Sequence, residues 1–346
     1  MNHIERVLAA IAHQEIDRVP WGEFWLEKGL VKKLLPGAEK VGVKEEAQVM
    51  ENLGMDIRAI PPGEQMEKER EIREGEVFCD AWGCTYIWRR GKKIFQRPAI
   101  TGLEHASSYV FPRPGQFDYS RIGEWSQSTD FFLFALLDGV FQGVASLLDF
   151  NEFLMATACN PAPIKELAEK RAQFLIEQAE LCVKAGAHGI MIGEDMAYNQ
   201  GTFISPKVLR SLFFPVLKAA VAKIKKLGVP VFLHSDGNLN SILEDLVELG
   251  IDGLQSLEPE AGMDLAQIKS KYGTRVCLMG NLDLGLLNKS TAEEVARVTE
   301  EVLTTAAPGS GFILSTSGGI LGQDIPAENL AAVSQTLKSW NYTCRP

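Results

Sequence analysis

The sequence predicts a single α/β domain folded as a (β/α)8 TIM barrel. The second half of the 346-residue chain alternates short apolar runs with longer helical patterns, which is typical of βα units built around a parallel sheet. The first half adds three apolar runs to these five, and eight strands close a barrel of this kind. No linker-like composition or solenoid-length repeat divides the chain, so we expect one domain over residues 1–346.

The chain begins with a predicted amphipathic helix over residues 1–16. Ile4, Val7, Leu8 and Ile11 share one face of this segment, and polar side chains surround them. The segment lacks the continuous apolar core of a signal peptide, and the sequence has no run of about 18 apolar residues that would span a membrane. The first three strands are expected at residues 18–24, 55–60 and 131–137.

A β-rich insertion over residues 61–129 interrupts the βα rhythm after the second strand. Its runs at 77–89 and 92–97 predict antiparallel strands joined by a turn at Arg90-Gly91. We expect this insertion to stand over the barrel mouth, because it replaces a loop that leaves the carboxyl end of a barrel strand.

The second half supplies the remaining five strands, which we expect at residues 189–193, 229–233, 251–257, 276–280 and 312–315. Helical patterns occupy residues 206–227, 241–249, 264–272 and 291–306 between them. Most of these helices begin with a Ser, Asp or Thr cap or with Pro in the first turn. Thr291 and Glu294 have the spacing of a capping box.

The composition narrows the class of protein. Hydrophobic residues make up 46% of the chain and charged residues 23%, which is ordinary for a soluble globular protein with a large core. The net charge is −10 and no Lys/Arg-rich block stands out, so neither a nucleic acid nor a membrane is an expected partner. The six cysteines form no CxxC pair, so we expect reduced, structural thiols and a cytoplasmic location.

Polar side chains accumulate where the predicted strands end, and active sites of such barrels lie at the carboxyl ends of the strands. These side chains are Glu23, Asp138, Glu194, Asp195, His234, Asp236, Glu258, Asn281, Asp283 and Ser317. Asn281 and Asp283 are explained equally well as caps of the helices that follow them. Ser317 precedes a Gly318-Gly319 pair, which resembles a phosphate-binding loop but also serves as a tight turn.

His234 is the most specific of these residues. It directly follows an apolar strand, and Glu194, Asp195 and Asp236 stand at the end of the same strand or of its predicted neighbour. A carboxylate beside an imidazole either orients it for acid–base chemistry or completes a metal site of nitrogen and oxygen ligands. A lone histidine at a strand end is also often a hydrogen-bonded core residue, and the spacing does not choose between these roles.

Several short motifs, taken in order, resemble the uroporphyrinogen decarboxylase superfamily. The motifs are Glu5-Arg6-Val7-Leu8, Asp17-Arg18-Val19-Pro20, Gly193-Glu194-Asp195, Phe232-Leu233-His234-Ser235-Asp236-Gly237-Asn238, Gly280-Asn281-Leu282-Asp283 and Ser317-Gly318-Gly319-Ile320. They extend over nearly the whole chain. The resemblance implies a TIM barrel with its reaction centre at the carboxyl ends of the strands.

The resemblance implies one of two chemistries. Decarboxylases proper remove acetate carboxyl groups from a porphyrinogen without a cofactor, and they carry Arg-Gln-Ala-Gly-Arg after the first strand to hold substrate carboxylates. Here that segment is Trp21-Gly22-Glu23-Phe24-Trp25, which has no arginine and places a carboxylate where it would repel such a substrate. A cofactor-free decarboxylase, with Asp138 or Glu23 pairing with a substrate NH group, is therefore the alternative interpretation.

The other branch contains corrinoid-dependent methyltransferases, which move a methyl group between a small molecule and a cobamide on a partner protein. Members that methylate thiols hold zinc with His-x-Cys and a distant cysteine. Here His234 keeps the histidine, whereas Asp236 and Ser317 stand at the cysteine positions. The resemblance thus implies a harder metal site made of Glu194, His234 and Asp236, with zinc as the expected metal and Lewis acid.

We therefore expect a methyltransferase for a methylated ether, amine or thiol, monomeric or homodimeric, with a separate corrinoid protein as partner. Its expected catalytic residues are the metal ligands Glu194, His234 and Asp236. Its expected substrate-binding residues are Glu23, Trp25, Asp138, Tyr198, Asn281, Asp283 and Ser317. A third possibility is a non-catalytic barrel that binds a small molecule without turnover and is indifferent to chelators.

Overall fold

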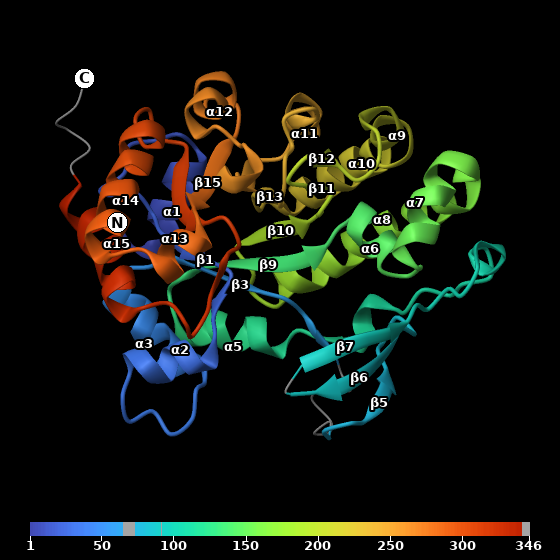
Figure 1. The fold of residues 1–346 in the computed structure, drawn as a ribbon, viewed down its shortest axis with the longest axis horizontal. Coiled ribbons are helices and arrows are strands. Elements are labelled where there is room, and N and C mark those ends of the chain that lie inside the picture. The colour runs from blue at the N-terminus through green and yellow to red at the C-terminus, as the bar shows by residue number, and fades with distance from the viewer. Residues whose placement is uncertain (65–72, 91, 341–346) are drawn as a thin grey trace.

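Eight parallel strands form one sheet in the computed structural model, which describes residues 1–64, 73–90 and 92–340; Gly91 of the predicted turn and Cys344 lie outside these ranges. In sheet order the strands are β1 (Gly22–Glu23), β3 (Ile57–Ile60), β9 (Phe132–Asp138), β10 (Gly189–Gly193), β13 (Val231–Ser235), β14 (Gly253–Ser256), β15 (Cys277–Leu282) and β16 (Phe312–Thr316). A parallel bridge between Trp21 and Leu314 joins the two edges of the sheet. The predicted (β/α)8 barrel is therefore confirmed (Figure 1).

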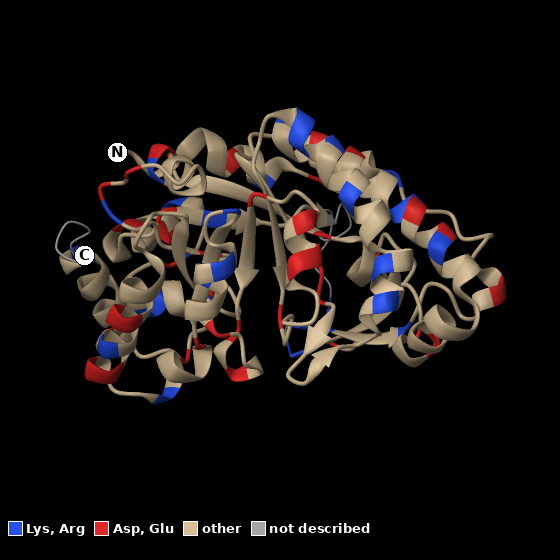
Figure 2. Ribbon diagram, turned by 90° about the horizontal axis from the view of Figure 1, so that it is seen from above, with Lys and Arg blue, Asp and Glu red and all other residues tan. Residues whose placement is uncertain are grey.

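Helices cover the outer face of the barrel (Figures 1 and 2). They are α2 (Lys28–Leu34), α3 (Val43–Leu53), α5 (Ser120–Ser128), α6 (Val140–Ala145), α7 (Phe150–Cys159), α8 (Pro161–Lys184), α9 (Pro206–Leu212), α10 (Phe214–Ile224), α11 (Leu243–Glu248), α12 (Leu265–Tyr272), α13 (Leu284–Lys289), α14 (Ala292–Ala306) and α15 (Ala327–Ser339), with short 3-10 turns at Leu103–His105, Pro114–Gln116, Lys225–Leu227 and Pro259–Ala261. Acidic and basic side chains are interleaved on these helices (Figure 2). Within the described ranges, no helix combines the length and the apolar character that a membrane crossing needs.

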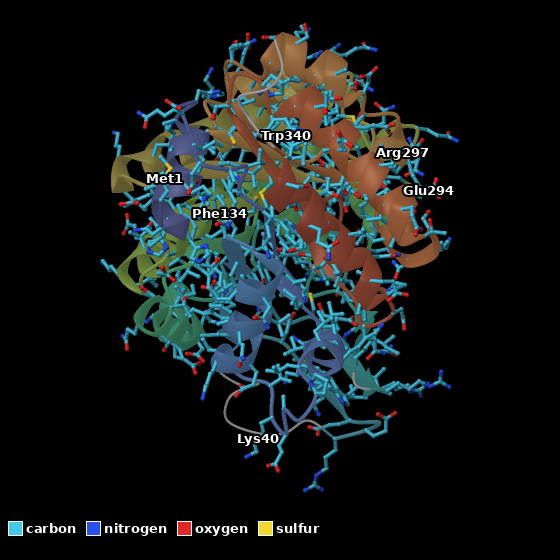
Figure 3. The ribbon with its side chains drawn as sticks, turned by 90° about the vertical axis from the view of Figure 1, so that its left-hand side faces the viewer. Met1, Lys40, Phe134, Glu294, Arg297 and Trp340 are labelled. Carbon is cyan, nitrogen blue, oxygen red and sulfur yellow. The ribbon has the colours of Figure 1, made fainter. Side chains whose placement is uncertain are left out.

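Side-chain alternation along the strands creates two apolar cores. Phe134, Met191 and Phe232 point into the barrel, where they pack together, whereas Ile190 and Leu233 pack outward against the helices. Figure 3 shows Phe134 at the centre of the molecule, while Glu294 and Arg297 of α14 lie on its outer surface. Glycine is required at two interior positions, because a Cβ at Gly189 or Gly253 would overlap a phenylalanine ring of the adjacent strand.

The N-terminal helix α1 (His3–Ile11) closes the amino end of the barrel. Asn2 caps it by accepting a hydrogen bond from the Glu5 N–H at 2.8 Å. The helix ends at Ile11, before the predicted residue 16, and His13 adopts a left-handed φ of 55°. Val7 and Ala10 pack against the interior core, so α1 seals the end opposite the expected reaction centre.

Two other predicted elements are interrupted by proline. The first strand begins only after Pro20, whose nitrogen cannot donate to a sheet, although its carbonyl accepts from the Leu314 N–H at 2.9 Å. The predicted helix over 206–227 divides into α9 and α10 at Phe213, two residues before Pro215. Pro215 has no N–H to continue the helical hydrogen-bond ladder.

The insertion contains a three-stranded antiparallel sheet of β5 (Val77–Cys79), β6 (Thr85–Arg89) and β7 (Lys92–Arg97), as well as the antiparallel pair β4 (Gly63–Glu64) and β8 (Phe117–Asp118). In Figure 1 the three-stranded sheet stands beside the barrel below α8. Trp82 contacts Phe174 of α8 with a ring-centroid distance of 4.7 Å. Trp82 and Phe117 also border a cavity shared with the end of β9, so the insertion forms one wall beside the carboxyl ends of the strands.

Two short strand pairs lie in the loops that follow the carboxyl ends of barrel strands. β2 (Trp25–Leu26) pairs with β17 (Ile320–Leu321), which links the loop after β1 to the loop after β16. β11 (Ala197–Tyr198) and β12 (Gly201–Thr202) form a hairpin after β10. These pairs fix the loops that carry the predicted site residues Trp25, Glu194, Tyr198 and Ser317.

Candidate active site

Asp195, His234 and Asp236 meet at the carboxyl ends of β10 and β13, and we call them the His234 cluster. These two strands are neighbours, with Gly193 in register with His234. His234 Nε2 lies 3.4 Å from Asp195 Oδ1, and the Asp236 backbone N–H donates to the same oxygen at 3.2 Å. One ligand atom from each of the three residues lies within 4.8 Å of the others, which is a possible metal-binding arrangement.

Gln255 of β14 fixes the orientation of the His234 ring. The Gln255 amide nitrogen donates to the carbonyl oxygens of Thr316 and Ser317, at 3.2 and 3.3 Å, so its amide oxygen faces His234 Nδ1. An acceptor at Nδ1 places the ring proton there and leaves the Nε2 lone pair directed at the carboxylates. Phe24 packs edge-on against the ring with a centroid distance of 5.1 Å. His234 is consequently held in one orientation and is only 8% exposed.

The two aspartates have distinct environments. Asp236 Oδ1 accepts a hydrogen bond from Ser256 Oγ at 2.8 Å. Burial raises the pKa of Asp195 above its ordinary value, against the opposing effect of His234, and the charges of Asp236 and Asp138 add to the increase. Burial therefore makes the Asp195 carboxyl group easier to protonate than that of an exposed aspartate.

Glu194, which was predicted as a metal ligand, is turned away from the cluster. Its carboxylate accepts the backbone N–H groups of Phe141 and Gln142 at the start of α6, at 2.8 and 3.1 Å, and that of Val140. Burial raises its pKa to about 7 despite these hydrogen bonds. A Cβ at Gly139 would overlap this carboxylate, so the glycine makes room for it. In the ligand set that the structure supports, Asp195 replaces Glu194.

Glu23 also lies away from the cluster and is completely buried. Its carboxylate accepts hydrogen bonds from Trp21 Nε1 at 3.0 Å and from the Thr316 N–H and Oγ1 at 2.9 and 2.6 Å. Burial raises the pKa of Glu23 to about 7. These contacts join β1 to β16, which is a structural position rather than the substrate-facing position that the sequence suggested. Phe24, the next residue, is the one that reaches His234.

Trp25 and Asp138 lie together in a cavity of about 310 Å³ at the ends of β1, β3 and β9. We call this the Trp25 cavity; its walls include Trp25, Pro61, Trp82, Leu136, Asp138 and Arg171. Asp138 contributes to the pKa of Asp195, so its side chain is within electrostatic reach of the His234 cluster. The cavity is therefore linked to that cluster through Asp138.

The remaining predicted substrate-binding residues are dispersed. Tyr198 is exposed on the β11–β12 hairpin and stacks on Phe203 with a centroid distance of 5.5 Å. Asn281 and Asp283 border a separate groove between α12 and α14, and Asp283 caps α13 by accepting from the Leu286 N–H at 2.7 Å. Ser317 is buried, and its contact with the site is made by its carbonyl oxygen, which accepts a hydrogen bond from Gln255.

Gln255, Phe24 and Arg171 border the site but were not predicted from the sequence. For Gln255 a signal existed: strand alternation after outward-facing Leu254 directs it into the barrel. Arg171 lies in the middle of α8, and its position beside the Trp25 cavity depends on how α8 packs.

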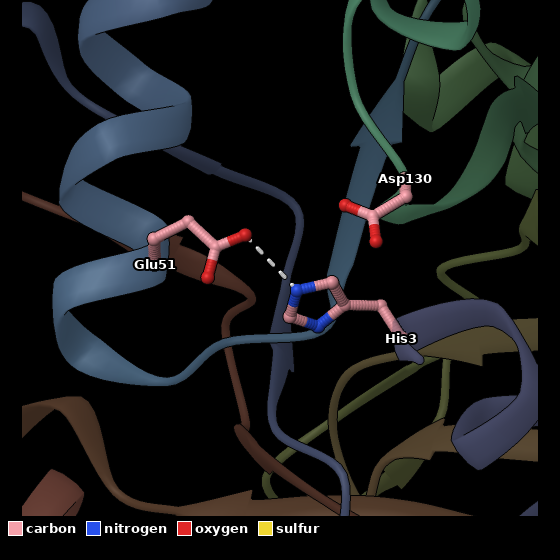
Figure 4. A group of neighbouring side chains, drawn as sticks. All are labelled: His3, Glu51 and Asp130. Carbon is pink, nitrogen blue, oxygen red and sulfur yellow. Dashed lines mark hydrogen bonds and ion pairs between the residues drawn. The ribbon is translucent and has the colours of Figure 1, made fainter. Parts of the chain in front are cut away.

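A second histidine–carboxylate group, made of His3, Glu51 and Asp130, lies at the amino end of the barrel (Figure 4). His3 Nδ1 is 2.8 Å from Asp56 Oδ1, and His3 Nε2 is 3.1 Å from Glu51 Oε1. Both ring nitrogens are thus occupied by carboxylates that tie α1 to the barrel. The geometry supports a structural role for this group.

Comparison with known proteins identifies related chains. The family model described as uroporphyrinogen decarboxylase (URO-D) matches residues 127–340. A uroporphyrinogen decarboxylase of Trichodesmium erythraeum is 25% identical over 56% of this chain and 52% of its own length. That of Psychromonas ingrahamii is 22% identical over 94% of both chains, and that of Legionella pneumophila is 29% identical over 50% of this chain and 46% of its own. With the first and third relatives, the match spans only about half of the relative's length.

Solved structures show the same fold. A methyltransferase from Methanosarcina mazei superposes with a TM-score of 0.77 at 19% identity, and 98% of each chain is covered. A B12-independent methionine synthase from Shewanella sp. W3-18-1 superposes with a TM-score of 0.52 at 15% identity, over 93% of this chain and 96% of that one. At these identities the similarity establishes the barrel architecture and not the reaction.

Proposed function

The chain belongs to the uroporphyrinogen decarboxylase family, and from this premise we propose that it is a methyltransferase. It would move a methyl group between a small methylated ether, amine or thiol and a cobamide carried by a separate protein. The observation that carries the proposal is the His234 cluster, in which an oriented imidazole nitrogen faces two carboxylates. The fold shared with the Methanosarcina mazei methyltransferase is consistent with it.

The cluster fits the expected divalent metal. It provides one nitrogen and two carboxylate ligands, and catalytic zinc sites in proteins commonly have three such ligands and one open position. Gln255 and Ser256 supply the hydrogen bonds to ligand residues that usually orient such a site. Held by Asp195, His234 and Asp236, zinc would supply Lewis-acid polarisation of the substrate heteroatom.

The residues of the chain itself favour departure of a methyl group from a heteroatom. Without metal, Asp195 Oδ1 and His234 Nε2, 3.4 Å apart, can hold a proton between them and deliver it to the oxygen, nitrogen or sulfur that loses the methyl group; with metal bound, the same two groups would be its ligands. Phe24 and the fixed Gln255 contact keep the imidazole in place, so little reorganisation accompanies this transfer. Trp25 and Leu136 give the adjacent cavity an apolar wall suited to a methyl group.

The test is the metal content of protein purified without chelators, together with methyl transfer to a corrinoid acceptor. We expect about one zinc per chain in the wild type and in His105→Ala, a control at an exposed histidine of the 3-10 turn Leu103–His105, and its loss in His234→Ala. Wild-type protein without stoichiometric zinc, combined with unchanged turnover in His234→Ala, would contradict the proposal.

A cofactor-free decarboxylase is the second candidate, because the curated relatives carry the name uroporphyrinogen decarboxylase. The structure leaves Asp138 at the Trp25 cavity as the carboxylate that could pair with a substrate NH group, while Glu23 is enclosed by its own hydrogen bonds. Release of carbon dioxide from a porphyrinogen by chelator-treated protein would favour this candidate over methyl transfer.

A further inference from the structure

Arg171 of α8 is buried at the Trp25 cavity. Its side chain is 1% exposed. Burial lowers the pKa of the guanidinium and the charges of Asp138 and Glu194 oppose that decrease, although no described residue forms an ion pair with it. Nε donates to the Gly139 carbonyl at 3.0 Å and Nη2 donates to the Asp138 carbonyl at 2.6 Å. Nη1 is buried and has no hydrogen-bond partner among the described residues. A buried guanidinium with an unused nitrogen is costly, and proteins usually satisfy such groups.

The guanidinium is held rigidly in place. Its central carbon lies 4.5 Å from the centroid of the Trp82 ring and 4.9 Å from that of Phe174, so two aromatic faces contact it. Gly143 of α6 leaves the space that the side chain occupies, because a Cβ there would overlap Nε. Rigid placement lowers the entropic cost of binding an anion, and the planar fork of arginine matches a carboxylate.

The Trp25 cavity provides the space for a ligand of this charge. Its volume is about 310 Å³, and apart from Asp138, Arg171 and Gln178 its lining is apolar. Asp138 presents its carbonyl oxygen to Arg171, while its carboxylate is within electrostatic reach of both Arg171 and Asp195. A ligand whose anionic end lies at Arg171 would thus extend past Asp138 toward the His234 cluster.

We propose that Arg171 binds the carboxylate of a small apolar ligand in the Trp25 cavity, which makes a carboxylate-bearing methylated compound the substrate class. This inference rests on the proposed function only in treating the cavity ligand as the substrate. Because Nη1 is screened from solvent, binding includes a side-chain rotation in the cavity wall, a common adjustment at binding sites. The bound carboxylate supplies the acceptor that Nη1 lacks.

The experiment measures binding to the full chain with pairs of matched probes. Each pair contains a carboxylate and its carboxamide, from acetate and acetamide to cyclohexanecarboxylate and cyclohexanecarboxamide. Calorimetry reports affinity, and tryptophan fluorescence reports occupancy because Trp25 and Trp82 line the cavity. The variants are Arg171→Met, Arg171→Lys and the control Arg121→Gln, an exposed arginine that lines a neighbouring cavity.

We expect the wild type and Arg121→Gln to bind at least one carboxylate about tenfold to a hundredfold more tightly than its carboxamide, as for a charge-assisted hydrogen bond. Arg171→Lys should lose most of this preference, and Arg171→Met all of it. If Arg171→Met does not fold, the test is the carboxylate preference of the wild type compared with that of Arg171→Lys. Equal affinity for acid and amide in every pair, no binding of any probe, or loss of the preference in Arg121→Gln instead would overturn the proposal.

These outcomes are independent of the reaction. Carboxylate-selective binding without methyl transfer would leave the Arg171 assignment intact and reject the proposed function. Methyl transfer combined with equal affinity for acid and amide would support the proposed function and reject the Arg171 assignment.

Discussion

Glu194 and Asp195 follow β10 directly, and strand alternation places their carboxylates on opposite sides of the sheet. Met191 and Gly193 face the barrel interior and Ile190 and Ile192 face the helices, so Glu194 continues the outer face. There it meets the N-terminus of α6, where backbone N–H groups need acceptors. The next residue, Asp195, returns to the interior and faces His234. One step along the chain thus separates a helix-capping carboxylate from a candidate ligand.

This division predicts different effects of two conservative substitutions. Asp195→Asn removes a charged ligand from the His234 cluster, so we expect zinc retention and turnover to be lost while thermal stability is kept. Glu194→Gln should retain zinc but lower the stability of the fold by about 1 kcal/mol, the typical value of a helix N-terminal cap. Metal analysis and thermal unfolding of both variants provide the measurement. Loss of zinc in Glu194→Gln alone would restore Glu194 as the ligand.

A further residue-scale prediction concerns Gln255, which contacts the imidazole and not the open face of the cluster. Gln255→Leu removes the acceptor at His234 Nδ1, so the ring can change tautomer and orientation. We expect zinc affinity to fall by about tenfold to a hundredfold, as for other groups that hold metal ligands in place. Titration with a competing chelator measures this. Affinity unchanged in Gln255→Leu but lost in His234→Ala would show that the contact does not orient the ligand.

At the scale of elements, α1 is tied to the barrel by a charged network. Arg6 and Arg18 both donate to Asp56, at 2.7 Å each, and Arg6 also pairs with Asp17 at 2.6 Å. His3 contacts Asp56 from the same helix. Because Asp56 is completely buried, these donors compensate its charge. The network holds α1 over the amino end of the interior core.

The His3 contact predicts a pH dependence of stability. Burial opposes the charged imidazolium, yet Asp56 and Glu51 raise its pKa above the ordinary value of 6.5. A raised pKa means that the stabilisation is fully present below about pH 6.5 and is lost as the pH rises through the folded-state pKa. The difference in unfolding temperature between wild type and His3→Gln should therefore be larger at pH 5.5 than at pH 8.5. His105→Gln, at an exposed histidine, serves as the control, and a difference independent of pH would refute the expectation.

For the whole molecule, periodicity predicted the barrel because alternating burial is a local property of each strand. All eight strands lie at or within the predicted runs or extend at most a few residues beyond them. The errors at the site have a common origin. The prediction treats every polar side chain after a strand as facing the barrel mouth. Glu23 and Glu194 instead continue the outward faces of their strands, on which Trp21 and Ile192 lie. Arg171 was not predictable, because its contacts depend on how α8 packs against the insertion.

The two apolar cores are complete without any metal, and this leads to a prediction for the molecule as a whole. No residue of the His234 cluster belongs to either core, whereas small zinc domains depend on metal to fold. Chelator treatment should therefore remove zinc and turnover while far-ultraviolet circular dichroism and cooperative unfolding persist, and added zinc should restore turnover. The bound metal would raise the unfolding temperature only by the mass-action contribution of a ligand to the native state. Unfolding on chelation would mean that the cluster is structural, and turnover that survives complete metal removal would direct attention to the acid–base pair of Asp195 and His234.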